Sequence, residues 1–276
     1  MKTLLCHVEQ GEQFGNYIET VLAVAQKYNS HVIASHITPS LNIYMPFTHD
    51  YMVPGEVTNS IVKEWVEIAN ETRAAFTRHW PAAGSPWEWI QTTGNTAATL
   101  IEQASTADLT IVNIGTRALS DGSQSWPLAS DITLSNGLPI LALPANCRTP
   151  LGSKPVIIAW DGSLEATHAI RHALPMLKSA SNIIVAEIEK YDDEKEEELP
   201  AADIAPFLAR HGLNVEGLSR VPVASIAEEL LDIAHENDAE LIVMGAYGHM
   251  RLREFFFGGV TRALLQSSDI PLFLCH

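Results

Sequence analysis

The feature that most constrains the fold of this chain is an internal repeat. In each half an acidic residue opens one apolar run and a proline opens a later one: Asp108 and Glu240 lie 132 residues apart, and so do Pro139 and Pro271. Because the offset is the same at both positions, the segment between the two runs keeps its length in both copies, as a repeated structural unit does. The repeat predicts two domains: residues 1–148 and 152–276.

Strand and helix patterns alternate within the second half. Short apolar runs, typical of strands buried on both faces, are separated by segments whose apolar residues recur at helical spacing. The expected strands are 155–160, 182–187, 214–220, 240–245 and 270–275, and the expected helices follow Ser163 or cover 201–211, 225–237 and 260–267. This alternation is typical of an α/β fold with right-handed crossovers. We therefore expect two tandem five-stranded parallel-sheet domains with helices on both faces.

Composition and charge exclude several classes of protein. Apolar residues make up 46% of the 276 residues, which is a core-forming composition and argues against a disordered chain. The formal net charge of −16 argues against partners such as nucleic acid or an anionic membrane, because both require a basic face. No apolar run is long enough to span a bilayer, the first seven residues resemble a strand rather than a signal peptide, and we expect a cytoplasmic protein.

The cysteines do not form a recognisable framework. Cys6, Cys147 and Cys275 are few, odd in number and far apart, so they indicate neither a disulfide pattern nor a metal site. No paired carboxylates, nucleophile elbow or positioned base is evident either, and we expect no catalytic residues and no resident metal.

A glycine-rich loop after the fourth expected strand of the second half carries the clearest functional signal. Gly245, Gly248, Gly258 and Gly259 follow the pattern Gly-x2-Gly-x9-Gly-Gly, and the last pair precedes a helix. Glycines after a buried strand permit positive φ and close approach of the backbone to a ligand, and a helix N-terminus offers free N–H groups to an anion. The alternative is that the glycines only form a tight turn and let the helix pack closely.

Other residues near this loop are candidates for the same site. Asp161, after the first strand of the second half, is placed to accept hydrogen bonds from a ribose or an adenine, or to hold a metal ion. His249 and Arg251 lie within the loop and are expected either to contact phosphate or to face solvent. Val260 lies beside the glycine pair, and Thr261 offers a hydroxyl donor.

The order and spacing of these residues resemble the universal stress protein family. The glycine pattern, the helix and proline-led strand that follow it, and the Trp160–Asp161–Gly162–Ser163 segment all contribute to the resemblance, which covers the chain as a tandem of two such domains. The resemblance implies sheet order 3-2-1-4-5, cytoplasmic location and pairing of domains through their last strands. It also implies binding of ATP or AMP, with Mg²⁺ accompanying ATP. Gly259 departs from the pattern, because nucleotide-binding members usually carry Ser or Thr there.

The first half lacks the glycine pattern. At the 132-residue offset the four glycine positions become Asn113, Thr116, Trp126 and Pro127, and proline has no N–H to donate to an anion. We expect this half to be a structural partner or to bind something else.

Three functions remain open at this point. The first is a regulatory stress-response protein whose second half binds an adenine nucleotide. The others are a ligand-free interaction protein and a slow ATPase. The two halves are expected to form a pseudo-dimer within one chain, and a homodimer is equally compatible with the sequence.

Overall fold

The computed structural model describes residues 1–11, 13–40, 55–82, 84–115, 127–147, 153–189, 201–248 and 259–276. The first half contains β1 (Thr3–His7), α1 (Phe14–Tyr28), β2 (His31–Thr38), α3 (Gly55–His79), β3 (Trp87–Thr93), α4 (Thr96–Ala104), β4 (Leu109–Asn113), α5 (Leu128–Asn136) and β5 (Ile140–Leu143). The second half contains β6 (Val156–Ala159), α6 (Leu164–Leu177), β7 (Ile183–Ile188), α7 (Ala201–Arg210), β8 (Val215–Arg220), α8 (Ile226–Glu236), β9 (Leu241–Gly245), α9 (Gly259–Ser267) and β10 (Leu272–Cys275).

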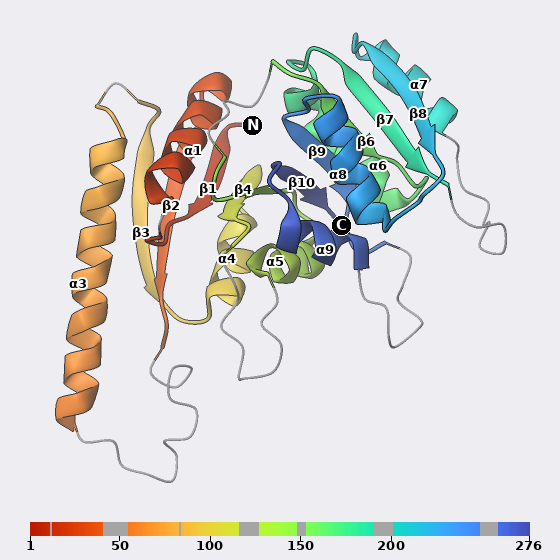
Figure 1. Cartoon of the computed structure of the whole chain (residues 1–276). Coiled ribbons are helices and arrows are strands. Elements are labelled where there is room, and N and C mark those ends of the chain that lie inside the picture. Colours follow the sequence, from red (N-terminus) through yellow and green to blue (C-terminus); the bar gives the residue numbers. More distant parts are fainter. Residues whose placement is uncertain are drawn as a thin grey trace.

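The strands form one ten-stranded sheet with the order β3-β2-β1-β4-β5-β10-β9-β6-β7-β8 (Figure 1). Within each half all neighbouring strands are parallel, and each half has the order 3-2-1-4-5 when its strands are counted along the chain. The expected α/β class and strand order are therefore confirmed. The predicted strands and helices of the second half agree with the observed ones to within two residues at each end.

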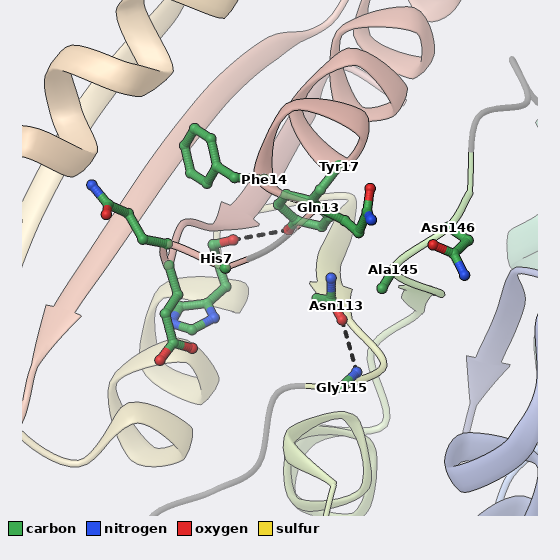
Figure 2. Close-up of a pocket in the computed structure, with 11 residues that line it drawn as sticks. His7, Gln13, Phe14, Tyr17, Asn113, Gly115, Ala145 and Asn146 are labelled. Carbon is green, nitrogen blue, oxygen red and sulfur yellow. Dashed lines mark hydrogen bonds between the residues drawn. The ribbon is translucent and has the colours of Figure 1, made fainter.

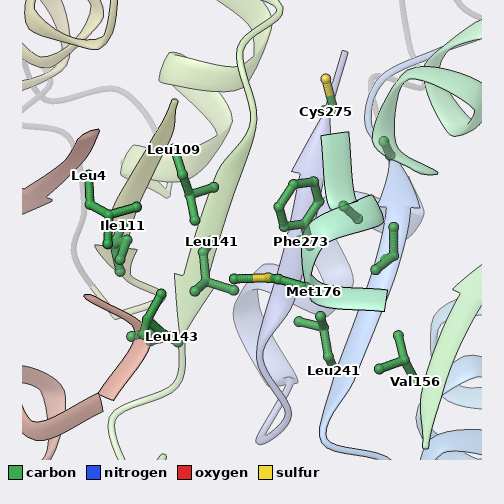
Figure 3. Packing of buried hydrophobic residues seen from close by; sticks show 14 of the residues in the cluster. Leu4, Leu109, Ile111, Leu141, Leu143, Val156, Met176, Leu241, Phe273 and Cys275 are labelled. Atoms are coloured by element: carbon green, nitrogen blue, oxygen red, sulfur yellow. The ribbon is translucent and has the colours of Figure 1, made fainter. Parts of the chain in front are cut away.

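The two halves meet through their last strands. β5 and β10 pair in the antiparallel direction, with Phe273 opposite Leu141. Each strand would otherwise present an apolar edge with unpaired backbone N–H and C=O groups. The pairing supplies hydrogen-bond partners for these groups on both strands. On one face of the seam Met176 of α6 lies close to both Leu141 and Phe273 (Figure 3), and one buried cluster continues across the halves.

Helices cover both faces of the sheet. Buried side chains of α1, α3, α6 and α7 belong to the cluster on one face, and those of α4, α5, α8 and α9 belong to the cluster on the other. Local signals start two of these helices: Ser163 caps α6, and Ser225 with Glu228 forms a capping box at α8. Within the described ranges no helix combines the length and the apolar character that crossing a bilayer requires.

Candidate functional site

The predicted site of the second half lies where the strand order reverses. β6 and β9 are adjacent, and Ala159 pairs with Met244 near their carboxyl ends. The helix that follows β6 packs on one face of the sheet and the helix that follows β9 packs on the other. Loops that diverge in this way leave a crevice at the carboxyl edge, which is the usual ligand position in doubly wound folds.

The loop after β6 is a tight turn held by Asp161. One carboxylate oxygen of Asp161 accepts hydrogen bonds from the Ser163 backbone N–H at 3.0 Å and from its hydroxyl at 2.5 Å. The Ser163 hydroxyl oxygen in turn accepts from the Ala166 N–H at 3.1 Å, which caps α6. Gly162 has φ of 75°, in the left-handed region that favours glycine. Asp161 itself is exposed, and one of its oxygens has this structural role; its predicted contact with a ligand stays a prediction.

Gly245 is required for close packing rather than for an unusual backbone angle. A Cβ atom at this position would lie 2.4 Å from the backbone nitrogen of Ala166 and 2.7 Å from the carbonyl carbon of Glu165. The end of β9 therefore touches the first turn of α6, which is the packing alternative considered from the sequence. Glycine permits a positive φ, but neither Gly245 nor Gly248 adopts one; among the described residues of this loop it is Tyr247 that does, with φ of 61°.

Gly248 faces an acidic side chain that the sequence analysis missed. A Cβ atom at Gly248 would lie 2.9 Å from Glu165 Oε2 and 3.7 Å from the Ser163 Cβ. Glu165 lies in the first turn of α6, where a carboxylate interacts favourably with the helix dipole. The first-turn position was readable from the sequence, but the approach of Glu165 to Gly248 depends on how α6 packs on β9. The structure thus brings the loops after β6 and β9 together, but with a carboxylate between them.

The start of α9 is the remaining described part of the predicted site. Gly259 is exposed, and a Cβ atom there would meet nothing within 4 Å. Val260 packs against the core, and Thr261 is only 3% exposed. His249, Arg251 and Gly258 lie outside the described residues, so their predicted contacts stay predictions.

Tyr247 connects the glycine loop to the first half of the chain. Burial raises the pKa of the Tyr247 hydroxyl. The charge of Asp131, in α5, adds to this rise, and the charge of Arg262 opposes it. The loop that would contact a ligand is therefore packed against the other half. Arg262 lies in the first turns of α9 and is a cation close to the loop that the sequence analysis did not consider.

Acidic groups dominate the described part of this site. Asp161 and Glu165 both lie at the junction of the two loops. Among the described ranges, no three His, Cys, Asp or Glu side chains come together as a metal site would require. A polyphosphate here would need backbone N–H groups and a divalent cation to offset repulsion by the carboxylates.

The first half contains a cavity at the corresponding place, which we call the first-half cavity (Figure 2). It has a volume of about 530 Å³ and is lined by eleven residues from the end of β1, the β1–α1 loop, the first turns of α1, and the loops after β4 and β5. The sequence analysis left the ligand of this half open and did not predict a cavity. The signal that was missed is the length of the β1–α1 loop: six residues connect β1 to α1, whereas four connect β6 to α6.

Comparisons with known proteins show which family and which solved structures this chain is similar to. Residues 152–276 match the model of the universal stress protein family. A universal stress protein from Archaeoglobus fulgidus superposes with a TM-score of 0.70 at 15% identity, covering 99% of this chain and 95% of the other. Two Pseudomonas aeruginosa proteins, one of them assigned to the universal stress proteins and the other of unknown function, give TM-scores of 0.58 and 0.57. Each is 15% identical to this chain and covers 100% of it, with 93% and 92% of their own chains aligned. No curated protein matches the sequence.

Proposed function

Since residues 152–276 are a domain of the universal stress protein family, we propose that this chain is a regulatory stress-response protein whose second half binds an adenine nucleotide, ATP or AMP. The nucleotide occupies the crevice between the carboxyl ends of β6 and β9. The observation that carries the proposal is the juxtaposition of the two loops: Gly248 lies beside Ser163, whose backbone N–H is held by Asp161.

The backbone supplies the anion contacts. The exposed N-terminus of α9 at Gly259 offers N–H groups and the positive end of a helix dipole, and no side chain at Gly259 obstructs access to them. Because these donors belong to the main chain, the absence of a hydroxyl at Gly259 removes one contact and leaves the others. Asp161 is placed to accept hydrogen bonds from the ribose or the base.

The acidic side chains determine how the phosphates can bind. Glu165 lies beside Gly248, and a γ-phosphate approaching that glycine would meet its carboxylate at close range. Glu165 and the phosphates would together be able to hold Mg²⁺, whose charge would offset the repulsion, since carboxylates and phosphates are its usual ligands. ATP is therefore expected to bind with Mg²⁺ and poorly without it.

A ligand-free interaction protein is the second candidate. It is favoured by the same two carboxylates: one oxygen of Asp161 is already engaged by Ser163, and Glu165 opposes an anion at Gly248. A slow ATPase would require a positioned water, and its test is release of phosphate from bound ATP.

Mass spectrometry of freshly purified protein and thermal unfolding with added nucleotide test the proposal. We expect adenine nucleotide to co-purify, and Mg-ATP to raise the melting temperature, since a ligand at ~100-fold its Kd stabilises the folded state by about 2.7 kcal/mol. Gly248→Val should abolish the shift. Protein free of nucleotide, together with no shift at millimolar Mg-ATP, would contradict nucleotide binding and favour the interaction protein.

Glu165→Gln provides a matched test of the electrostatics. The substitution keeps the shape of the side chain and removes its charge, so ATP should bind more tightly in the presence of EDTA than it does to the unaltered protein. Equal affinity of both proteins for metal-free ATP would show that Glu165 does not face the phosphates.

A further inference from the structure

The ten-stranded sheet ends in β3 on one side and in β8 on the other (Figure 1). Within the described residues no strand pairs with the outer edge of β8, which we call the β8 edge. Two of the three most exposed large apolar side chains in the described ranges lie just after this strand: Val221 at 62% and Val223 at 95%. Unpaired strand edges invite pairing with another strand, so the β8 edge is a candidate interaction surface.

The backbone groups that β8 offers at this edge follow from its pairing with β7. The carbonyl groups of Asn214 and Arg220 accept hydrogen bonds from β7 at 2.8 and 2.9 Å, so the even-numbered residues of β8 direct their backbone groups inward. Because the direction alternates along a strand, Val215, Gly217 and Ser219 direct their N–H and C=O groups to the β8 edge. A strand that joins this edge must form its hydrogen bonds with these three residues.

Side chains of β8 alternate between the two faces of the sheet. Val215 packs against the buried cluster on the α6 and α7 face, and Leu218 packs against the cluster on the α8 face. Glu216 and Arg220 therefore share the face of Leu218, and Arg220 indeed binds Glu236 of α8. A second copy related by a two-fold axis perpendicular to the sheet keeps each face on the same side. Residues that lie opposite one another must then come from the same face.

One antiparallel register meets these requirements and also pairs opposite charges. Its two-fold axis passes through Leu218, so Gly217 lies opposite Ser219 of the second copy and exchanges backbone hydrogen bonds with it. Glu216 then lies directly opposite Arg220 of the second copy, and the symmetry repeats this pair. Opposite charges at facing positions of neighbouring strands stabilise the pairing, whereas like charges oppose it.

The neighbouring registers lose this match. An axis one residue earlier or later places Arg220 opposite Asn214 or Leu218 and leaves no pair of opposite charges on the two strands. The axis at Leu218 also brings the exposed Val221 opposite Val215 of the second copy, which removes apolar surface from water. The strand is thus self-complementary in its backbone groups, its charges and its apolar side chains.

The Arg220 guanidinium can bind a second carboxylate. It pairs through both Nη atoms with Glu236 and lies 3.7 Å from Glu229. Arginine has five N–H donors, so donors remain for a carboxylate of a second copy. At the other end of the sheet, Glu88 is the one charged residue of β3, and a symmetric pairing of β3 brings no opposite charges together. The observations therefore favour the β8 edge over that of β3.

We propose that two copies of this chain pair through the β8 edge, antiparallel about a two-fold axis at Leu218, so that two ten-stranded sheets form one continuous sheet. The arrangement repeats between copies the antiparallel edge pairing that joins β5 to β10 within the chain. A two-fold dimer uses the β8 edge of both copies and leaves neither of them open. This inference is independent of nucleotide binding by the second half.

Sedimentation velocity on the full chain, from micromolar to millimolar protein, tests the proposal. We expect a concentration-dependent equilibrium between monomer and dimer. Glu216→Arg should weaken the dimer by roughly tenfold or more, because both symmetric charge pairs become repulsive. Glu88→Arg, the matched control on β3, makes the same change of charge at another exposed edge position and should not weaken the dimer. A general effect of net charge would change both variants alike.

Cysteine crosslinking tests the register. Leu218→Cys places two thiols opposite each other at a Cα separation of ~4.5 Å, which lies within the ~4.4–6.8 Å that a disulfide spans. Mild oxidation should therefore give a covalent dimer, whereas Ile90→Cys on β3 should stay monomeric. The natural cysteines are buried and should not compete.

A second pair of variants covers the case in which Leu218→Cys does not fold. Gly217→Cys is sterically tolerated, since a Cβ atom there meets nothing within 4 Å, and Ser219 is exposed. A mixture of the Gly217→Cys and Ser219→Cys proteins should crosslink, and each protein alone should do so far less. The proposal is overturned if the chain is monomeric at every concentration, if Glu216→Arg leaves the dimer unchanged, or if position 90 crosslinks and these positions do not.

Discussion

Gly245→Ala is expected to destabilise the protein through one contact. The added Cβ would lie 2.4 Å from the backbone nitrogen of Ala166, whereas ordinary contacts begin at 3.4 Å, so α6 must move by about 1 Å relative to β9. Overpacking of this kind costs ~1–3 kcal/mol. Alanine also lowers the conformational entropy of the unfolded chain relative to glycine, which offsets about 0.4–1 kcal/mol of that cost. Since the obstacle is main chain and cannot rotate away, we expect the free energy of unfolding to fall by about 2 kcal/mol.

Urea unfolding followed by circular dichroism, together with thermal melting, measures this loss. For a chain of this size about 2 kcal/mol corresponds to a fall in melting temperature of roughly 4–8 °C. Gly248→Ala is the matched control, because its Cβ meets the end of the flexible Glu165 side chain at 2.9 Å, which can move. That variant should stay within ~0.5 kcal/mol of the unaltered protein. Equal stability of the Gly245→Ala and Gly248→Ala proteins would refute the packing argument.

Two other predictions concern stability. Ser163→Ala removes the cap of α6, and Ser225→Ala removes the cap of α8, since both serines accept a hydrogen bond from a first-turn N–H. Each substitution should lower the free energy of unfolding by ~1 kcal/mol, measured in urea. An unchanged free energy of unfolding in Ser163→Ala would contradict the assigned cap. His7 has a folded-state pKa of about 4 against an ordinary 6.5, so the unfolded chain takes up its proton first as the pH falls. Stability should therefore drop between pH 6.5 and 4 by about 3 kcal/mol from this group, at ~1.4 kcal/mol per pH unit. His7→Gln should flatten the plot of urea midpoint against pH in that range, and parallel curves for the two proteins would show that His7 is not buried neutral.

The fold could be predicted from the sequence because its signals are local and repeated. The 132-residue offset fixed the length of the unit, apolar runs fixed the strands, and cap residues such as Ser163 and Ser225 marked helix starts. The strand order came from the family resemblance, since local patterns do not specify which strands are neighbours. Antiparallel pairing of β5 with β10 then follows from placing two such units edge to edge.

The details of the candidate site depend on contacts between distant segments, which spacing does not reveal. Glycines permit a positive φ, but the described residue of the loop that adopts one is Tyr247, which spacing does not reveal. Glu165 was missed because its approach to Gly248 depends on the packing of α6 on β9. The two additional residues between β1 and α1 were countable in the sequence, yet the cavity that they create also needs Tyr17 to bridge two strands.

Calorimetric titration of Mg-ATP into Gly259→Pro and Gly259→Ala proteins tests nucleotide binding by the second half most directly. Gly259 is the first residue of α9, a position where proline is tolerated, and Pro127 occupies the matching place in the first half. Proline removes one backbone N–H and alanine keeps it. Binding that is preserved in Gly259→Ala and weakened by about tenfold in Gly259→Pro, the loss expected for one charge-assisted hydrogen bond, would agree with main-chain anion recognition. Equal affinity of the two variants, or heat signals no larger than those of dilution for the unaltered protein, would contradict it.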